Sequence, residues 1–163
     1  MSDTPLVRLV GVSKGFVKGQ ETISIFHDLD LKIPAGDFVA VLGENGVGKT
    51  LTLHTLAGLR PPGRGSILLG AEALGQLRRR EVAQRLGLLL QDDAETFPAT
   101  VLETTLMGRH PHLSGTESAV DLALARAALA AMGLTGFDDR VVSTLSGGER
   151  RRLALARLLT QDP

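Results

Sequence analysis

The sequence has no cysteine, no tryptophan and no tyrosine, and its only large aromatic residues are five phenylalanines. The lack of cysteine excludes disulfides, thiol nucleophiles and zinc–thiolate sites, and it suits a reducing compartment. The scarcity of aromatic rings argues against a platform on which single-stranded nucleic acid would stack.

An excess charge of either sign is also missing, because 18 lysines and arginines balance 18 aspartates and glutamates. Net charge therefore favours neither nucleic acid as a partner nor an acidic tail. No apolar run approaches the roughly 20 residues that span a bilayer. The first residues, MSDTPLVRLVGVSKG, lack the basic region and apolar stretch of a secretion signal. We expect a soluble or membrane-peripheral intracellular protein with no nucleic-acid partner.

The hydrophobic pattern predicts an α/β fold with strands first and helices later. Near-alternating residues predict strands over 6–12 and 22–33, and continuous apolar runs predict buried strands over 38–42 and 86–90, with a short strand over 67–69. Helices are expected over 49–59, 77–85 and 117–132 and from just after Gly148. The three arginines at 78–80 are interpreted as part of a solvated helix face.

Residues 43–50 read GENGVGKT and match the phosphate-loop pattern G-x-x-x-x-G-K-[ST]. Its glycines let the backbone turn so that successive N–H groups face phosphate oxygens, and the following helix adds its positive dipole end. Lys49 would reach the β- and γ-phosphates and the Thr50 hydroxyl would bind Mg²⁺. This motif, placed between a predicted strand and a predicted helix, predicts nucleotide binding.

A second motif, Leu145-Ser146-Gly147-Gly148-Glu149, precedes the last helix. A Ser hydroxyl and free N–H groups at a helix start can bind an anion, although the same residues also make an ordinary helix cap. Together with the phosphate loop, this motif resembles the signature of the ATP-binding subunit of ABC transporters. The resemblance extends over essentially the whole chain.

The resemblance implies a set of site residues for ATP and Mg²⁺. Gln91 looks like the glutamine that contacts Mg²⁺ or the attacking water, and Phe16 occupies the region of the aromatic that stacks on adenine. Catalytic roles are implied for Lys49, Gln91 and Ser146, and metal binding for Thr50 and Gln91. The residues implied to bind ATP are Phe16, Gly43, Glu44, Asn45, Gly46, Val47, Gly48, Lys49, Thr50, Leu51, Ser146, Gly147, Gly148 and Glu149.

The resemblance also implies a fold and its extent. We expect one nucleotide-binding domain over 1–163: a phosphate-loop NTPase core with an antiparallel β subdomain over 1–91, and an α-helical signature subdomain over 92–163. In the family a strand with catalytic Asp and Glu follows, and then a His. Since the sequence ends at Pro163 before them, we expect the chain to lack the last third of the domain, to bind nucleotide weakly and to hydrolyse it negligibly.

Other acids and histidines are weaker candidates. Asp92, Asp93, Glu95, Asp138 and Asp139 are interpreted as loop and cap acids. His110 and His112 flank a proline without a third ligand nearby, so a metal site there is disfavoured.

Residues 100–113, TVLETTLMGRHPHL, resemble the segment that follows the conserved glutamine in importers of iron chelates, haem and cobalamin. The resemblance implies transmembrane permease subunits, a second ATP-binding subunit as a homodimer partner and a periplasmic or surface substrate-binding protein. It places the chain on the cytoplasmic face of the membrane. Two alternatives stay open: a soluble ABC-type ATPase acting on ribosomes or DNA, and a module that binds nucleotide without hydrolysing it.

Overall fold

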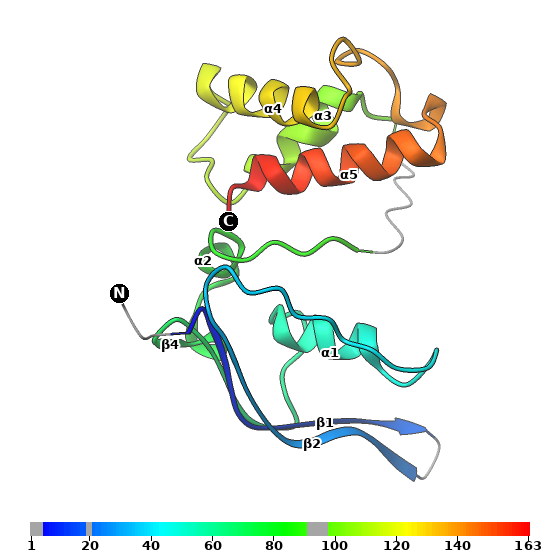
Figure 1. Cartoon of the computed structure of the whole chain (residues 1–163). Coiled ribbons are helices and arrows are strands. Elements are labelled where there is room, and N and C mark those ends of the chain that lie inside the picture. The colour runs from blue at the N-terminus through cyan, green and yellow to red at the C-terminus, as the bar shows by residue number, and fades with distance from the viewer. Residues whose placement is uncertain (1–4, 19–20, 91–97) are drawn as a thin grey trace. The chain divides into compact units, whose positions relative to one another are not determined.

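The computed structural model describes residues 5–18, 21–90 and 98–163, and divides the chain into two compact units, Met1–Arg78 and Arg79–Pro163. Strands lie in the first unit and most helices in the second (Figure 1). The predicted α/β class, with an antiparallel sheet and several helices, is confirmed. The second unit begins at Arg79, earlier than the division at residue 91 that the sequence suggested.

The first unit is built on a four-stranded antiparallel sheet in the order β2-β1-β3-β4. Its strands are β1 (Val7–Lys18), β2 (Glu21–Ile33), β3 (Arg64–Leu69) and β4 (Glu72–Ala73). Val7 lies opposite Ile33 on one side and Leu69 on the other, which fixes the register of the three longer strands. Leu9 and Ile67, which face each other across the β1–β3 ladder, are both buried.

Strands β1 and β3 approach so closely at Gly65 that no side chain fits there. Gly65 has a φ of +80°, and a Cβ atom on it would lie 2.3 Å from the carbonyl oxygen of Gly11. Both the left-handed backbone and the neighbouring main chain therefore require glycine at this position. Gly11 in turn donates its N–H to Asp30 Oδ1 at 3.0 Å, where the β1–β2 ladder is irregular.

Two predicted buried strands are absent from the described structure. Residues 38–42 and 86–90 form no strand and pair with none of the described strands. Phe38 is 95% exposed and Leu42 is 89% exposed. An apolar run becomes a strand only when another strand completes its hydrogen-bond ladder, and the described residues supply no such strand.

The first unit also contains helix α1 (Lys49–Leu56), which begins directly after Gly48. It was predicted to reach residue 59 but ends earlier, at Ala57, followed by Gly58 with a φ of +72°. A left-handed glycine after the last turn is a common helix ending. A short 3₁₀ turn, η1 (Leu74–Gln76), follows the sheet.

The second unit consists of helices that start at hydrogen-bonded caps. Its elements are α2 (Arg79–Ala83), α3 (Val101–Leu106), η2 (Met107–Arg109), α4 (Ala119–Ala131), η3 (Val142–Thr144) and α5 (Gly147–Gln161). Helices α3, α4 and α5 each begin with a capping box, in which the cap hydroxyl and an acidic side chain three residues later each accept the other's backbone N–H. The pairs are Thr100 with Glu103, Ser118 with Asp121 and Ser146 with Glu149.

These three helices enclose the core of the second unit (Figure 1). Val101, Leu129 and Leu153, one from each helix, are at most 2% exposed. Leu134, Val142 and Leu145 close the core from the connecting segments. Leu145 belongs to the LSGGE motif, so this motif is anchored in the core by its first residue.

None of the helices in the described part of the chain is long and apolar enough to cross a membrane.

Candidate functional site

The phosphate loop, residues 43–50, lies in the first unit and leads directly into α1. Gly46 and Gly48 have φ angles of +84° and +105°, which glycine adopts without strain. A Cβ atom on Gly48 would also lie 2.5 Å from the Ile25 side chain of β2. The glycine pattern is therefore required by the shape of the loop.

Lys49 closes the loop from its own helix. Its Nζ donates to the carbonyl oxygens of Gly43 and Glu44, each at 2.7 Å. A cationic group is thus held at the first turn of α1, where the helix dipole already favours anions.

The backbone N–H groups of the loop are oriented by the same turn. Within the described residues, the N–H groups of Lys49, Thr50 and Leu51 have no acceptor, whereas that of Thr52 donates to Gly48 O at 2.9 Å. Free N–H groups at a helix start, left-handed glycines and a lysine ammonium together fit the phosphates of a nucleotide. The exposed Thr50 is at the position from which a hydroxyl would bind Mg²⁺.

Glu44, Asn45 and Val47 are exposed residues of the loop, and Leu51 lies in the first turn of α1. Glu44 O accepts the Val47 N–H at 3.4 Å, which tightens the turn. Phe16 lies on β1 opposite Ile23, and its proposed contact with adenine remains a prediction. Gln91 lies outside the described residues.

The LSGGE motif lies in the second unit and forms the start of α5. Ser146 is the helix cap: its Oγ accepts the Glu149 N–H at 3.3 Å, and its own N–H donates to Glu149 Oε2 at 2.7 Å. Gly147 and Gly148 are exposed, and a Cβ on Gly147 would meet nothing within 4 Å. The ordinary capping function is thus present, and it leaves the exposed glycine backbone at the helix start open to a ligand.

The charged group at this helix cap is the Glu149 carboxylate. The backbone and side-chain hydrogen bonds from Ser146 lower the pKa of Glu149, and the charges of Arg140 and Arg152 lower it further. Arg140 Nη1 lies 3.5 Å from Glu149 Oε1 and its guanidinium stands 4.2 Å from the centre of the Phe137 ring. Glu149 is therefore an ionised structural acid that holds Ser146 in place.

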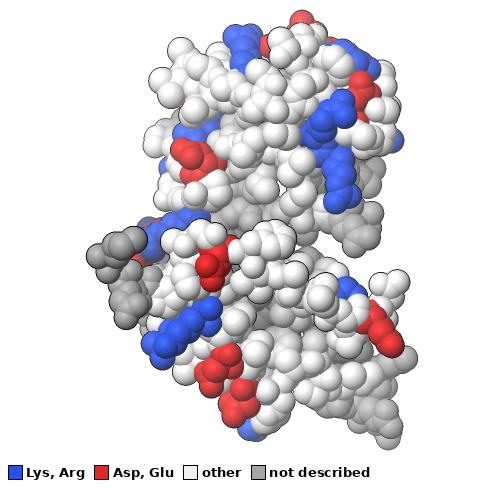
Figure 2. Space-filling model, viewed as in Figure 1, with Lys and Arg blue, Asp and Glu red and all other residues white. Residues whose placement is uncertain are grey.

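Figure 2 shows acidic and basic side chains interspersed on the visible face, with no region of one sign dominating it. This distribution agrees with the balanced composition. The candidate anion sites therefore depend on local backbone geometry and single cations more than on a broad basic surface.

One acid and one histidine outside the motifs, both considered above, have structural partners. Asp138 pairs with Arg126 at 2.9 Å. His112 Nε2 lies 2.8 Å from the carbonyl oxygen of Gln161. Among the described residues, no three His, Cys, Asp or Glu side chains could together hold a metal ion. Asp92, Asp93 and Glu95 lie outside the described residues.

A cluster at the C-terminal turn of α5 was missed at the level of sequence. Arg109 and His112 meet Thr160 and Gln161 there, although the two segments are far apart in the chain. A single glutamine at the last position of a helix carries no recognisable signal. Arg109 was considered only as part of the segment 100–113, and His112 only as part of that segment and as a disfavoured metal ligand.

Comparison with known proteins decides the family. The model of the family described as "ABC transporter" matches residues 26–163. The chain belongs to the ABC transporter family. The resemblance carried by the phosphate loop and the LSGGE motif is thereby confirmed.

This ABC-family chain is similar to import proteins over most of its length. It is 41% identical to the hemin import ATP-binding protein HmuV of Gloeobacter violaceus, covering 84% of this chain and 50% of that protein. It is 36% identical to the ferric enterobactin transport ATP-binding protein FepC of Escherichia coli, covering 96% of this chain and 58% of that protein. The chain thus spans between 50% and 58% of the length of these two relatives.

Solved structures share its fold. The ATP-binding cassette MJ0796, dimeric in a post-hydrolysis state with ADP and Pi, gives a TM-score of 0.82 at 27% identity, covering 96% of this chain and 70% of that one. A bacterial Atm1-family ABC exporter with ATP bound gives 0.79 at 26% identity, covering 100% of this chain and 29% of that one. The fold is thus shared with both of these ABC structures.

Proposed function

We propose that this ABC-family chain is the nucleotide-binding part of a transport ATPase and binds ATP with Mg²⁺ at residues 43–51. The observation that carries the proposal is the loop itself, in which the Lys49 ammonium and the free N–H groups at the start of α1 converge. Ammonium and backbone N–H donors of this kind are the groups that bind the oxygens of the β- and γ-phosphates.

Each site residue has a defined task in this proposal. Lys49 binds the terminal phosphates and the Thr50 hydroxyl binds Mg²⁺. Phe16 stacks on adenine, and Gln91 orients the metal or the attacking water. Hydrolysis depends on positioning and on stabilising the charge of the γ-phosphoryl group.

Ser146 serves a second nucleotide in this proposal. Two cassettes pack head to tail, and Ser146, Gly147 and Gly148 of one cover the phosphate loop of the other. The exposed glycine backbone at the start of α5 supports this assignment, since, apart from its chain neighbours and the backbone of its own helix, no described residue lies within 4 Å of a Cβ atom placed on Gly147. The dimeric state reported for the cassette MJ0796 supports it as well.

The transported substrate is proposed to be an iron chelate, haem or cobalamin. Support comes from the names of relatives, which include hemin, petrobactin, ferric enterobactin and cobalamin proteins. The partners are then permease subunits and a substrate-binding protein, and the chain works at the cytoplasmic face of the membrane.

The test is nucleotide binding by the chain and by a Lys49→Ala variant, measured by calorimetry with Mg-ATP. Removing charge-assisted hydrogen bonds worth about 2 kcal/mol should raise Kd roughly thirtyfold. Lys32→Ala, which removes an exposed lysine from β2, is the matched control and should leave Kd unchanged. Equal affinities for the two variants would contradict the proposed site.

A further inference from the structure

The last turn of α5, the helix that starts at Ser146, is contacted by two other segments of the second unit. The first is residues 107–113. Arg109 Nη1 donates to the carbonyl oxygen of Thr160 at 3.2 Å, and the His112 ring lies 2.8 Å from that of Gln161. Carbonyls at a helix end have no partner within the helix, so these side chains satisfy them.

The second segment is residues 83–90, which lead to Gln91. The side-chain amide of Gln161 donates to the carbonyl oxygen of Ala83 at 2.6 Å and to that of Leu86 at 3.0 Å. An amide group has two N–H donors, and both are used. Ala83 is the last residue of α2 and Leu86 begins the apolar run, so one side chain holds both ends of this bend.

Glycines allow both segments to approach α5 closely. A Cβ atom on Gly108 would lie 2.3 Å from the carbonyl oxygen of Arg157, and one on Gly87 would lie 2.3 Å from Leu158 Cδ1. The close packing at Gly87 and Gly108 is therefore evidence, independent of the hydrogen bonds, that both segments contact α5.

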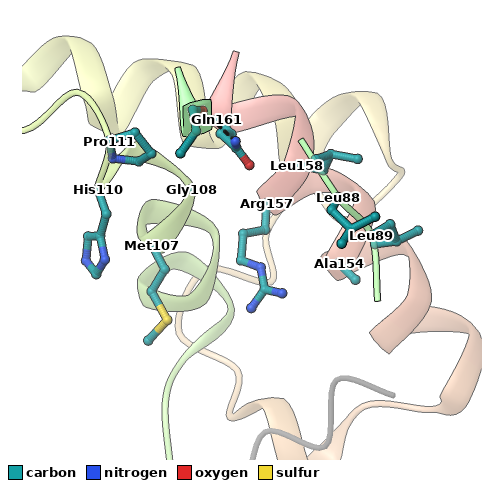
Figure 3. A pocket seen from close by; sticks show the side chains of 11 residues that line it. Leu88, Leu89, Met107, Gly108, His110, Pro111, Ala154, Arg157, Leu158 and Gln161 are labelled. Atoms are coloured by element: carbon teal, nitrogen blue, oxygen red, sulfur yellow. Dashed lines mark hydrogen bonds between the residues drawn. The ribbon is translucent and has the colours of Figure 1, made fainter. Parts of the chain in front are cut away.

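Gln161 also borders a cavity of about 230 Å³. Figure 3 shows Leu88 and Leu89 lining this cavity beside Leu158 and Ala154 of α5. Leu88, Leu89 and Leu90 have no strand partner among the described residues. The Gln161 hydrogen bond to the Leu86 carbonyl is a polar contact that holds the start of this run against α5.

We propose that Gln161 is a positioning residue that fixes the segment leading into Gln91 to the signature helix α5. The roles of Gln91 and Ser146 in this statement rest on the proposed function. Because the Gln161 side chain binds the Leu86 carbonyl, a shift of α5 moves the start of this segment as well. Residues 107–113 are carried along, because Arg109 and His112 bind the same turn.

The test uses the natural lack of cysteine in the chain. Cysteines introduced at Leu90, which is 42% exposed, and Leu159, which is 52% exposed, carry nitroxide labels for pulsed electron resonance. With Gln161 present we expect a single narrow distance peak. Gln161→Leu and Gln161→Glu should lose it, because neither offers a donor to the two carbonyls. Gln161→Lys should retain it, because an ammonium group donates to both.

Comparing the Leu, Glu and Lys variants distinguishes the effect of hydrogen-bond donation by residue 161 from the effect of its side-chain volume. A narrow peak in Gln161→Glu, or its loss in Gln161→Lys, would overturn the proposal. If Gln161→Leu fails to fold by circular dichroism, the Glu and Lys variants decide alone. Gln76→Leu, an exposed glutamine in the first unit, is the control and should leave the peak unchanged.

Nucleotide binding is measured on the same samples. Gln161 is not part of the phosphate loop, so its variants should keep the Lys49-dependent binding of Mg-ATP, with a smaller change in Kd than Lys49→Ala causes. A parent that fails to bind would overturn the proposed function but would leave the distance result standing as a property of the second unit.

Discussion

Asp121 connects two helices through one carboxylate. Its Oδ2 accepts the N–H of Ser118 at 2.9 Å and so caps α4, while its Oδ1 accepts from Arg109 Nε at 2.8 Å. The side chains of Asp121 and Arg109 are each 11% exposed. Arg109 continues to the Thr160 carbonyl, so the start of α4 is linked to the end of α5.

This arrangement predicts a pH dependence. The Ser118 side-chain and backbone hydrogen bonds, followed by Arg109, lower the pKa of Asp121 from 3.8 to about 2. A carboxylate with a lowered pKa stabilises the fold above its ordinary pKa, and this stabilisation is lost as pH falls toward the folded value. The free energy of unfolding should therefore decrease between about pH 4 and about pH 2.

Urea unfolding followed by circular dichroism checks this expectation. Asp121→Asn should be less stable than the parent at neutral pH and should show a shallower decline in acid. The difference between the two proteins isolates Asp121 from Glu103 and Glu149, whose pKa values are also lowered by their caps. Ser118→Ala, which removes the largest cause of the shift, should show an intermediate slope. Identical slopes for the parent and Asp121→Asn would refute the assignment.

The starts of four helices were predicted from the sequence to within two residues, but α3, which also begins with a capping box, was not predicted. Residues SGGE specify the start of α5 through a local pair three positions apart. The helix begins at Gly147, two residues before the predicted start just after Gly148, because Ser146 is its cap. The phosphate-loop motif likewise specifies a turn and a helix without help from distant residues. Short-range chemistry is visible in a sequence because all its partners are neighbours.

The prediction of strands at the two apolar runs was wrong for the opposite reason. The pattern at 38–42 and 86–90 records a tendency to be buried, but a strand exists only as part of a ladder. Gln161 was missed on the same grounds, since its partners Ala83 and Leu86 are distant in the chain. Long-range partners were the information that the sequence pattern lacked.

The exposed run at 38–42 predicts self-association. A nearly fully exposed Phe38 and Leu42 offer apolar surface and unpaired backbone to a second molecule. Phe38→Ser should reduce concentration-dependent association in sedimentation velocity and change the free energy of unfolding by less than about 0.5 kcal/mol. Leu9→Ser, at a site only 2% exposed, is the contrasting variant and should destabilise strongly. A comparable loss of stability from both substitutions would show that Phe38 is packed.

At the scale of the whole molecule, each compact unit has buried residues of its own. Leu9 and Leu69 are buried in the first unit, and Leu129 and Leu153 in the second. The phosphate loop belongs to the first unit and the LSGGE motif to the second. The two halves of the proposed ATP chemistry therefore depend on separate cores.

Leu129→Ala tests this division. Truncating a leucine that is 1% exposed should destabilise the second unit by about 2–5 kcal/mol. Hydrogen exchange read by mass spectrometry should show faster exchange in α3, α4 and α5, with β1 and β3 unchanged. Leu69→Ala should give the reverse pattern. Faster exchange throughout the chain in both variants would indicate one cooperative unit.

The three capping boxes also determine where the chain tolerates a change of length. Each helix start depends on a hydroxyl and a carboxylate separated by two residues, so a single insertion between them removes both hydrogen bonds at once. The exposed stretch from Ser114 to Glu117, just before the second box, has no such constraint. Length variation among homologous chains should therefore accumulate between the helices, while the spacing of each Ser or Thr from its acid stays fixed.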